Sequence, residues 1–342
     1  MNRSVIGIDL AKNSFSVCSL NQRGKVLFSK TFSRHRLSVF LKTTEKTFVA
    51  MEACGGAHHW ARMAKEAGHE VKMMNPKFVK PFVKSNKNDD ADAQAIAEAA
   101  IRESIPRVPV KEMWQQDILV LHRVKERLTK NKVALSNEIR GFLLEFGITI
   151  PIGTASFRKK ISQILGDDSE NLSQMFKDEL QELVDEFDSM LDRLAQAKTK
   201  IKTVSKTNEV CQKLEKVPGV GPMISTALVA AVGDATNYKN GRHMAAWIGL
   251  VPRHSGTGGK NRISGISKRG DRYLRCLLIQ GAQTVINWAG RDDNPQRNWI
   301  NKKLSSKERN KVAVAVANKN ARILWKLLAT DAEFDQSLAY AV

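Results

Sequence analysis

Four carboxylates near the N-terminus have the types and spacing to hold a divalent metal ion. Asp9 and Glu52 each follow a short apolar run, and Asp89 and Asp92 stand at the start of an alanine-rich stretch. Converging carboxylates repel one another unless a hard cation lies between them, and Mg²⁺ takes oxygen ligands. Because carboxylate-bound Mg²⁺ commonly supports in-line attack on a phosphodiester, this group predicts metal-dependent phosphate chemistry.

Each carboxylate taken alone also has a structural explanation. Asp9 can simply end a strand, and Asp89 or Asp92 can cap a helix N-terminus, where negative charge is favourable. The order of two strand ends followed by an Asp-x-x-Asp helix start is more specific than any one member. The neighbouring His58 and His59 point in different directions on a helix, so we interpret them as structural, or as groups supporting the Glu52 site.

The second candidate site is the Gly- and Ser-rich segment at residues 251–275, which we expect to form a loop. One of its serines could act as a nucleophile, activated and held by neighbouring cations. The residue types alone leave Ser255, Ser264 and Ser267 open, and a loop that grips phosphates without chemistry is the simpler alternative. The cations of the segment are Arg253, Lys260, Arg262, Lys268, Arg269, Arg272 and Arg275.

The charge of the chain indicates a polyanionic partner. Lys and Arg number 55 against 35 Asp and Glu, a formal net charge of +20. Residues 239–326 alone hold 19 Lys and Arg against four acids. Each phosphate that such a patch neutralises releases counterions, which favours nucleic acid over a merely solubilising surface. No long apolar run or basic amphipathic helix stands out, so we expect no membrane partner.

The stretch VPGVGP at residues 217–222 has the form of the turn in a helix–hairpin–helix motif. Gly219 and Gly221 would let the backbone approach a DNA phosphate, which the amides of the following helix could bind. Such turns also occur in tight helix connections that bind nothing. The basic composition of the chain favours the DNA contact.

Short strands and helices must position the carboxylates, in the alternation typical of an α/β domain that starts with a hairpin. We expect strands at residues 5–8, 15–20, 25–32, 47–51 and 71–74, and helices at 37–43, after 56 and at 92–102. Beyond residue 109 the pattern becomes helical, with a long helix at 114–146 and a break at 151–166.

Apolar residues from Phe176 to Ile201 then step alternately by 4 and 3, the spacing of a coiled coil or long helical hairpin. We expect this stripe to serve structure and oligomerisation. An apolar helix at residues 223–232 and the basic segment follow. The last dozen residues are expected to form a loose tail.

Six stretches occur in order along nearly the whole chain: IGIDLAKNSF, VAMEACGGAHHWA, NPKFVKPFVKSNKNDDADA, VPGVGP, GLVPRHSGTGGK and GISKRGDRYLR. Together they resemble the DEDD transposases, an insertion-sequence recombinase family that includes the Piv DNA invertase and the bridge-RNA-guided recombinases. The resemblance implies a ribonuclease-H-like catalytic domain similar to the Holliday-junction resolvase RuvC (residues 1–105), a helical linker and coiled coil (106–206), and a mostly helical transposase domain (207–330). A tail (331–342) would follow.

The resemblance also assigns the site. The acidic tetrad of the family falls on Asp9, Glu52, Asp89 and Asp92, and its nucleophilic serine, in a Ser-Gly pair after a Pro-Arg element, falls on Ser255. It implies that this serine attacks a DNA phosphodiester and forms a covalent phosphoserine. Mg²⁺ held by the tetrad would then lie near the scissile phosphate.

The resemblance further implies donor and target DNA as substrates, a structured bridge-type non-coding RNA that pairs with both, and a homo-oligomer between dimer and tetramer. We expect a cytoplasmic protein, associated with the nucleoid when it acts. Two alternatives stay open: a Piv-like site-specific DNA invertase, and a metal-dependent Holliday-junction-type nuclease without a serine nucleophile. A non-catalytic nucleic-acid-binding scaffold would leave the ordered carboxylates unexplained.

Overall fold

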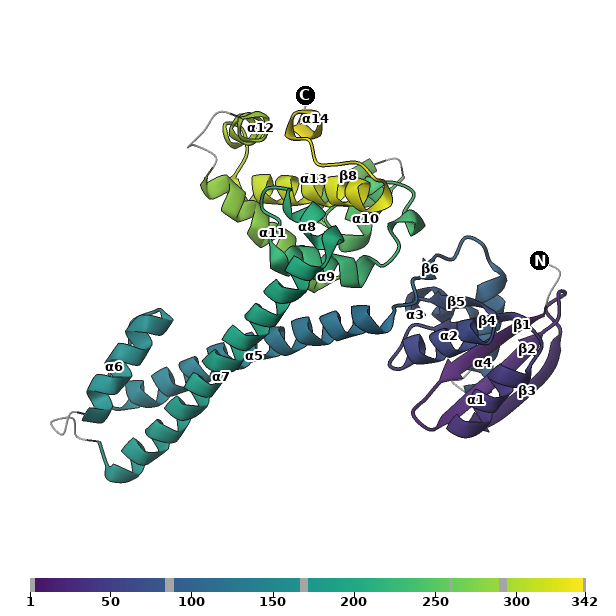
Figure 1. Cartoon of the computed structure of the whole chain (residues 1–342), viewed down its shortest axis with the longest axis horizontal. Helices are drawn as coiled ribbons and strands as arrows, with labels where there is room; N and C mark the ends of the chain where they lie inside the picture. The colour runs from purple at the N-terminus through teal and green to yellow at the C-terminus, as the bar shows by residue number, and fades with distance from the viewer. Residues whose placement is uncertain (1–3, 84–88, 167–171, 259, 289–293, 341–342) are drawn as a thin grey trace. The chain divides into compact units, whose positions relative to one another are not determined.

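The computed structural model describes residues 4–83, 89–166, 172–258, 260–288 and 294–340 (Figure 1). The chain divides into two compact units. One contains Met1–Gln116 and Ala230–Lys239, and the other contains Asp117–Val229 and Asn240–Val342. Within the described residues, no helix combines the length and the apolar composition needed to span a membrane.

The first unit is built on a six-stranded mixed sheet with the strand order β3-β2-β1-β4-β5-β6. The first three strands form an antiparallel meander, β1, β4 and β5 run parallel, and β6 returns antiparallel to β5. The five strands predicted from sequence are confirmed. Their bounds are β1 (Val5–Leu10), β2 (Ser14–Leu20), β3 (Val26–Ser33), β4 (Phe48–Glu52) and β5 (Glu70–Met74), with β6 at Arg107–Val108.

Helices cover both faces of this sheet, and the alternation of buried residues along each strand explains why. Ile6, Ile8, Val49 and Met51 pack with the buried residues of α1 and α2 on one face. The opposite face, which includes Ala50, packs against α4. The helices are α1 (Arg34–Thr43), α2 (Ala57–Glu66), α3 (Pro76–Val79) and α4 (Asp89–Ile101), with a short 3-10 turn η1 at Lys80–Phe82. This mixed sheet is compatible with the ribonuclease-H-like domain that the resemblance implies.

Long helices form the first part of the second unit. The predicted long helix is α5 (Met113–Glu145), most of which belongs to this unit, and the predicted heptad stripe lies on α7 (Gln174–Thr207). Leu180 and Phe187 of the stripe pack against Leu135 and Ile139 of α5. Part of the stripe is therefore buried within the chain itself.

The expected break at residues 151–166 is wrong, because α6 (Thr154–Gly166) occupies most of it. Phe157, Ile161 and Ile164 are buried on one side of this helix and join the core with α5 and α7. Their i, i+4, i+7 spacing is the pattern of an amphipathic helix. The polar residues between them concealed this pattern in the sequence.

The C-terminal half of the chain surrounds a central helix, α13, which packs against α8, α10, α11 and α12. Three helices in this part of the chain begin at Asn or Asp N-caps. The side chains of Asn240, Asp271 and Asn294 each accept a hydrogen bond from the backbone amide three residues ahead. The elements are α8 (Glu209–Glu215), α9 (Pro222–Val232), η2 (Ala235–Asn237), α10 (Gly241–Ile248), β7 (Pro252–Thr257), β8 (Lys260–Ile266), α11 (Arg272–Asn287), α12 (Pro295–Leu304), α13 (Arg309–Ala329) and α14 (Gln336–Tyr340).

The C-terminal segment is not the loose tail that the sequence suggested. Tyr340 of α14 is 1% exposed, its hydroxyl donates to Asn320 of α13 at 3.1 Å, and it accepts from the side-chain amide of Gln296 at 2.7 Å. Asn320 in turn donates to the carbonyl of Pro218. A single buried aromatic residue with a satisfied hydroxyl therefore fixes the segment onto the second unit.

Candidate active site

Asp9 and Glu52 lie at the same edge of the sheet. β1 and β4 are adjacent and parallel, with Ile8 opposite Met51, so the two carboxylates are the next residues of their strands. Side chains alternate between faces along a strand. Because Ile8 and Met51 enter the core beneath α1 and α2, Asp9 and Glu52 face the side of the sheet that α4 covers.

The thiol of Cys54 is close enough to Asp9 and Glu52 for their charges to affect its pKa. Its residue reaches the surface, yet its sulfur is partly buried and lies 3.9 Å from the carbonyl oxygen of Leu10. This partial burial, then the charges of Glu52 and Asp9, raise the pKa of the Cys54 thiol. Negative charge is therefore concentrated at this edge of the sheet.

Helix α4 carries the other two carboxylates of the predicted tetrad. A Cβ atom on Gly7 would overlap the carbonyl of Ala93, so α4 crosses β1 at van der Waals distance, two residues before Asp9. Asp92, which precedes Ala93, is partly exposed, and the side chain of Asp89 lies outside the described residues. Among the side chains that the structure describes, no three His, Cys, Asp or Glu residues are close enough to hold a metal ion.

The two histidines near Glu52 differ in surroundings. His58 accepts a hydrogen bond from the backbone amide of Lys111 at 3.1 Å through Nδ1. Burial, together with the charges of Lys111 and Arg62, lowers the pKa of His58 to about 4. His59 is exposed and makes an edge contact with the ring of Trp60. His58 therefore has a partner within the fold, and its role beside the Glu52 site stays a prediction.

The predicted serine loop is a two-stranded hairpin of β7 and β8. Ser255 on β7 is exposed and lies opposite Arg262 on β8, and Arg253 lies opposite Ser264. Directly opposed residues share a face of the ladder, as do residues two apart along one strand. Ser255 therefore shares its face with two exposed arginines, Arg253 and Arg262, whereas His254 belongs to the other face.

The other two serine candidates have different surroundings. The hydroxyl of Ser264 lies 3.5 Å from the carbonyl oxygen of Arg253 within the hairpin. The hydroxyl of Ser267 is buried, and no described group is within hydrogen-bond distance of it. Ser264 is also exposed, and by the same pairing it shares its face with Arg253 and Arg262. The geometry therefore separates Ser255 and Ser264 from the buried Ser267, and the choice of Ser255 over Ser264 stays with the family resemblance.

The base of the hairpin is tied to the end of α10. The amides of Ser267 and Lys268 donate to the carbonyls of Val251 and Gly249, at 2.8 and 3.2 Å. The guanidinium of Arg275 donates to the carbonyl of Ile248 at 2.9 Å. Arg275 is only 7% exposed, so its expected contact with nucleic acid is corrected. The guanidinium of Arg275 instead forms hydrogen bonds within the fold, and these hold the GISKRGDRYLR segment against α10.

The other predicted cations of this segment whose side chains the structure describes lie at the surface. Lys268, Arg269 and Arg272 are all exposed, and Lys268 has the positive φ of 54°. The side chain of Lys260 lies outside the described residues. Together with Arg253 and Arg262, these exposed side chains make the hairpin and its base a basic surface.

The two glycines of the VPGVGP turn have different roles. Gly219 has φ of 84°, and a Cβ atom there would lie 2.6 Å from Cγ2 of Val285 and 2.8 Å from the carbonyl oxygen of Gly281. Its Cα therefore packs closely against α11, while the residue stays partly exposed, and the expected backbone contact of Gly219 with DNA stays a prediction. Around Gly221 no described heavy atom lies within 4 Å of such a Cβ, so this position remains open.

Sequence reasoning missed a buried network that positions the start of α11. His122 of α5, 1% exposed, lies 2.9 Å from the hydroxyl of Tyr273 through Nδ1 and 3.0 Å from Oγ1 of Thr226 through Nε2. The Thr226 hydroxyl donates to the carbonyl of Pro222, so it accepts from Nε2–H of His122, which leaves Nδ1 to accept from Tyr273. A lone histidine in a long helix of mixed polar and apolar residues gives no sign in the sequence of these partners.

Comparisons with known proteins identify the family. A family model described as Transposase IS116/IS110/IS902 family matches residues 211–296, and a model of DEDD transposases of the IS110 group matches residues 6–148. The chain is 42% identical to a probable family 20 transposase of Pseudomonas aeruginosa, over 97% of this chain and 98% of that protein.

Two further relatives extend the comparison. The chain is 38% identical to the transposase for insertion sequence element IS1111A of Coxiella burnetii, covering 95% of this chain and 89% of that protein. It is 22% identical to the pilin gene-inverting protein of Moraxella bovis, covering 99% of both. With its two matched regions and its full-length relatives, the chain belongs to the IS116/IS110/IS902 family of transposases.

Proposed function

We propose that this transposase cuts and rejoins DNA through a covalent bond between Ser255 and a DNA phosphate. In the first step the Ser255 oxygen would bond to phosphorus as its hydroxyl proton leaves. The phosphorus–oxygen bond to one deoxyribose breaks, and the released deoxyribose oxygen takes up a proton. In the second step a hydroxyl of another strand attacks the same phosphorus and frees the serine, so the number of phosphodiester bonds is conserved.

The observation that carries this proposal is that Ser255 is exposed on the same face of the β7–β8 hairpin as Arg253 and Arg262. Ser264 shares this face, and the Ser-Gly pair of the family resemblance selects Ser255. A phosphate bonded to Ser255 would lie within reach of both guanidinium groups. Guanidinium forks match phosphate oxygens in geometry and stabilise the charge that develops on them during transfer. Arg275 fixes the base of the hairpin against the end of α10, and this would keep the face that carries Ser255 turned toward the substrate.

The carboxylate edge of the first unit fits a hard divalent cation in its chemistry. Asp9 and Glu52 supply oxygen donors at the ends of neighbouring strands, and α4, which carries Asp89 and Asp92, covers the same face. We assign Mg²⁺ to these four residues; when bound, it would supply positive charge to the scissile phosphate. The carboxylates themselves would orient the site and exclude competing cations that prefer nitrogen or sulfur ligands.

The substrates proposed are donor and target DNA, in keeping with the net charge of +20 and with relatives named as transposases. Guidance by a bridge-type RNA, and assembly as a dimer to tetramer, are proposed from the family resemblance. Site-specific inversion is a second candidate, because the similarity to the pilin gene-inverting protein extends over 99% of the chain. Both activities would use the same serine chemistry.

The test compares strand exchange with simple cutting. Wild-type protein, Ser255→Ala, Ser264→Ala and Asp9→Asn are each incubated with Mg²⁺, the RNA transcribed from the flanks of its own element, and labelled donor and target DNA. We expect Ser255→Ala and Asp9→Asn to abolish both cutting and exchange, with Ser264→Ala active. Retained cutting by Ser255→Ala would contradict the serine mechanism and indicate a hydrolytic nuclease.

Full activity of Asp9→Asn would contradict the metal assignment. Replacing Asp9 by Asn keeps the size of the side chain and removes its charge, so a loss of activity with an unchanged thermal unfolding curve separates chemistry from folding. Titration of Mg²⁺ provides the matched measurement: Asp9→Asn and Glu52→Gln should need a higher concentration of Mg²⁺ for any residual cutting.

A further inference from the structure

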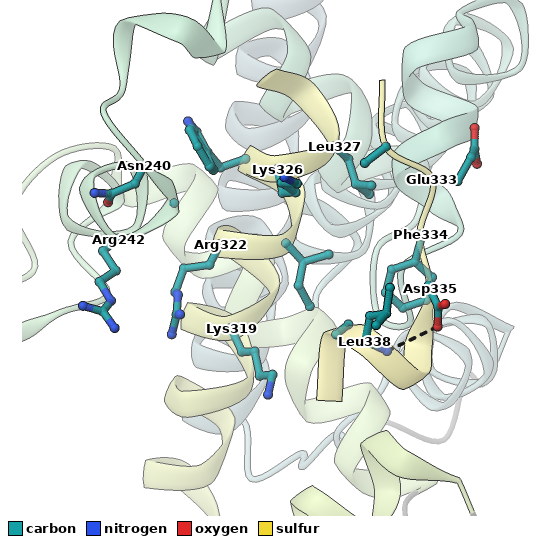
Figure 2. A pocket seen from close by; sticks show the side chains of 15 residues that line it. Asn240, Arg242, Lys319, Arg322, Lys326, Leu327, Glu333, Phe334, Asp335 and Leu338 are labelled. Atoms are coloured by element: carbon teal, nitrogen blue, oxygen red, sulfur yellow. Dashed lines mark hydrogen bonds between the residues drawn. The ribbon is translucent and has the colours of Figure 1, made fainter. Parts of the chain in front are cut away.

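A pocket of about 710 Å³ lies in the second unit, between the start of α10, one face of α13 and the C-terminal segment (Figure 2). Its volume is within the range of about 300–1,000 Å³ that is typical of ligand sites. Gly241, the first residue of α10, lies directly against the backbone of Arg322, which brings Arg242 beside that residue. We call this the α10–α13 pocket.

Four cations line the α10–α13 pocket: Arg242, Lys319, Arg322 and Lys326. Three of them follow one stripe of α13 with the spacing i, i+3, i+7, although like charges at these spacings destabilise a helix. Burial, and then the charges of Arg322 and Lys303, lower the pKa of Lys319. The cations therefore repel one another in the free protein, and an anion in the pocket would relieve that repulsion.

Lys319 differs from the other three because it is held in place by aromatic rings. Its Nζ lies 4.7 Å from the ring centroid of Trp299 and 4.6 Å from that of Tyr340. Arg242, Arg322 and Lys326 are exposed. In the part of the chain that the structure describes, none of these three forms an ion pair with a carboxylate.

The two acids at the pocket are already engaged elsewhere. Glu333 forms an ion pair with Lys216 at 2.5 Å, and hydrogen bonding to Lys216 lowers the pKa of Glu333. Asp335 accepts hydrogen bonds from Ser337 and from the amide of Leu338 at the start of α14, and these bonds lower its pKa. The four cations of the pocket outnumber these two acids, and Glu333 is already paired with Lys216, so the pocket keeps a positive balance.

The far side of the pocket combines two apolar side chains with the acids Glu333 and Asp335. Phe334 is partly buried and Leu338 is 77% exposed, and in Figure 2 both lie on the right while Arg242 and Arg322 lie on the left. A nucleotide strand presents phosphates along one side and base faces along the other once its bases are unstacked. A duplex instead presents phosphates at its surface and keeps its base faces covered.

We infer that the α10–α13 pocket binds a single-stranded segment of nucleic acid, with phosphates at Arg242, Arg322 and Lys326 and a base against Phe334 and Leu338. This site is separate from the Ser255 hairpin, and it rests on the proposed function in taking nucleic acid as the ligand. The shared chemistry is the phosphodiester strand. It comes from unpaired RNA or from a displaced DNA strand, which the experiment distinguishes.

The test measures binding in a Ser255→Ala background, so that it needs no covalent chemistry. Fluorescence anisotropy follows labelled oligouridine, oligothymidine and a short DNA duplex. The variant Arg242→Ala/Arg322→Ala/Lys326→Ala is compared with Lys159→Ala/Lys200→Ala/Lys202→Ala, which removes equal charge from exposed positions of α6 and α7. We expect the pocket variant to bind single strands about tenfold more weakly than the control, with the slope of log K against log salt reduced by about 2.

A second measurement uses the unaltered pocket and so does not depend on the folding of a variant. Acetylation of Lys326 in the Ser255→Ala protein should slow when a single strand is bound, whereas acetylation of Lys200 should not change. Protection by oligouridine but not oligothymidine would identify RNA as the ligand, and the reverse would identify DNA.

Equal affinity of the pocket and control variants for both single strands, together with unprotected Lys326, would overturn the inference. So would protection by duplex alone. A failure of Ser255 to form an adduct would leave these binding results unchanged, so the two proposals fail separately.

Discussion

The guanidinium of Arg275 donates to the carbonyl of Ile248 at 2.9 Å and reaches the carbonyl of Arg269 at 3.3 Å. The first of these bonds joins the first turn of α11 to the end of α10, and the second links two residues within the GISKRGDRYLR segment. The buried guanidinium of Arg275 therefore holds together the base of the exposed hairpin that carries Ser255. Arg275, which the sequence suggested as a phosphate contact, instead stabilises the position of the hairpin that carries Ser255.

Arg275→Met should loosen this base, because it leaves the Ile248 carbonyl buried without its charged partner. Hydrogen bonds to charged groups contribute about 1.5–3 kcal/mol, so we expect a loss of stability of that order. Hydrogen exchange provides the local measurement, since the amides of Ser267 and Lys268 should exchange faster. Arg272→Met, at an exposed neighbour, is the control and should change stability by less than about 0.5 kcal/mol.

The contact between Gly219 and Gly281 predicts a sharp difference between glycines. A Cβ atom on Gly281 would overlap the carbonyl of Gly219 and lie 2.8 Å from Cδ1 of Ile224. Gly281→Ala should therefore destabilise the second unit by about 1–3 kcal/mol, as overpacking does. Gly221→Ala, at the open position of the same turn, should leave the thermal unfolding midpoint nearly unchanged. Equal effects of the two changes would contradict the packing described.

The buried imidazole of His122 predicts a dependence of stability on pH. Burial, then the charges of Lys125 and Arg123, lower the pKa of His122 from 6.5 to about 4. Between these values the unfolded chain binds the proton and the folded chain does not, so stability falls as the pH is lowered through that window. The contribution is fully present above pH 6.5 and is lost by about pH 4.

The measurement is the slope of unfolding free energy against pH in wild type and in His122→Asn. The variant is expected to be less stable at neutral pH, because Tyr273 and Thr226 lose a partner. Its slope between pH 4 and 6.5 should be smaller, by at most about 1.4 kcal/mol per pH unit. Since the lowered pKa of His58 adds its own slope in both proteins, only the difference between them reports on His122. Parallel curves would show that folding does not lower the pKa of His122.

Tyr340 predicts that the last residues contribute to stability. Tyr340→Phe removes the hydroxyl that joins Asn320 and Gln296, and should cost about 1 kcal/mol. Tyr340→Ala also removes a buried ring and should cost about 3–5 kcal/mol. Leu338→Ala, at a position 77% exposed, is the control for the same helix. If Tyr340→Ala left the free energy of unfolding nearly unchanged, Tyr340 would not anchor the C-terminal segment, which would then be a loose tail.

The sheet could be predicted because its strands carry short apolar runs bounded by turn residues. The edge where Asp9 and Glu52 meet also followed from sequence, since both end apolar runs and parallel strands end at one edge. What could not be predicted was the partner of each cation. Arg275 and Arg272 are alike in composition and neighbourhood, and only the packing of α11 on α10 separates the buried one from the exposed one.

The same limit explains the other corrections. α6 has four large apolar residues, Phe157, Ile161, Ile164 and Leu165, and the helical spacing of the three buried ones matters only because α5 and α7 offer a surface that covers them. Tyr340 stands in a polar, short segment whose single aromatic ring is buried by α12 and α13. Burial by elements distant in sequence leaves no local signal.

The most direct test of the central claim is to find the atom that carries the DNA. The wild-type protein is incubated with Mg²⁺, element RNA and donor DNA, denatured, and digested with nuclease and protease, and the peptide that retains a nucleotide is sequenced by mass spectrometry. We predict a nucleotide attached to Ser255, and no such modified peptide in Ser255→Ala or in Asp9→Asn. A nucleotide on Ser264 or another residue, or cleaved DNA with no modified peptide, would contradict it.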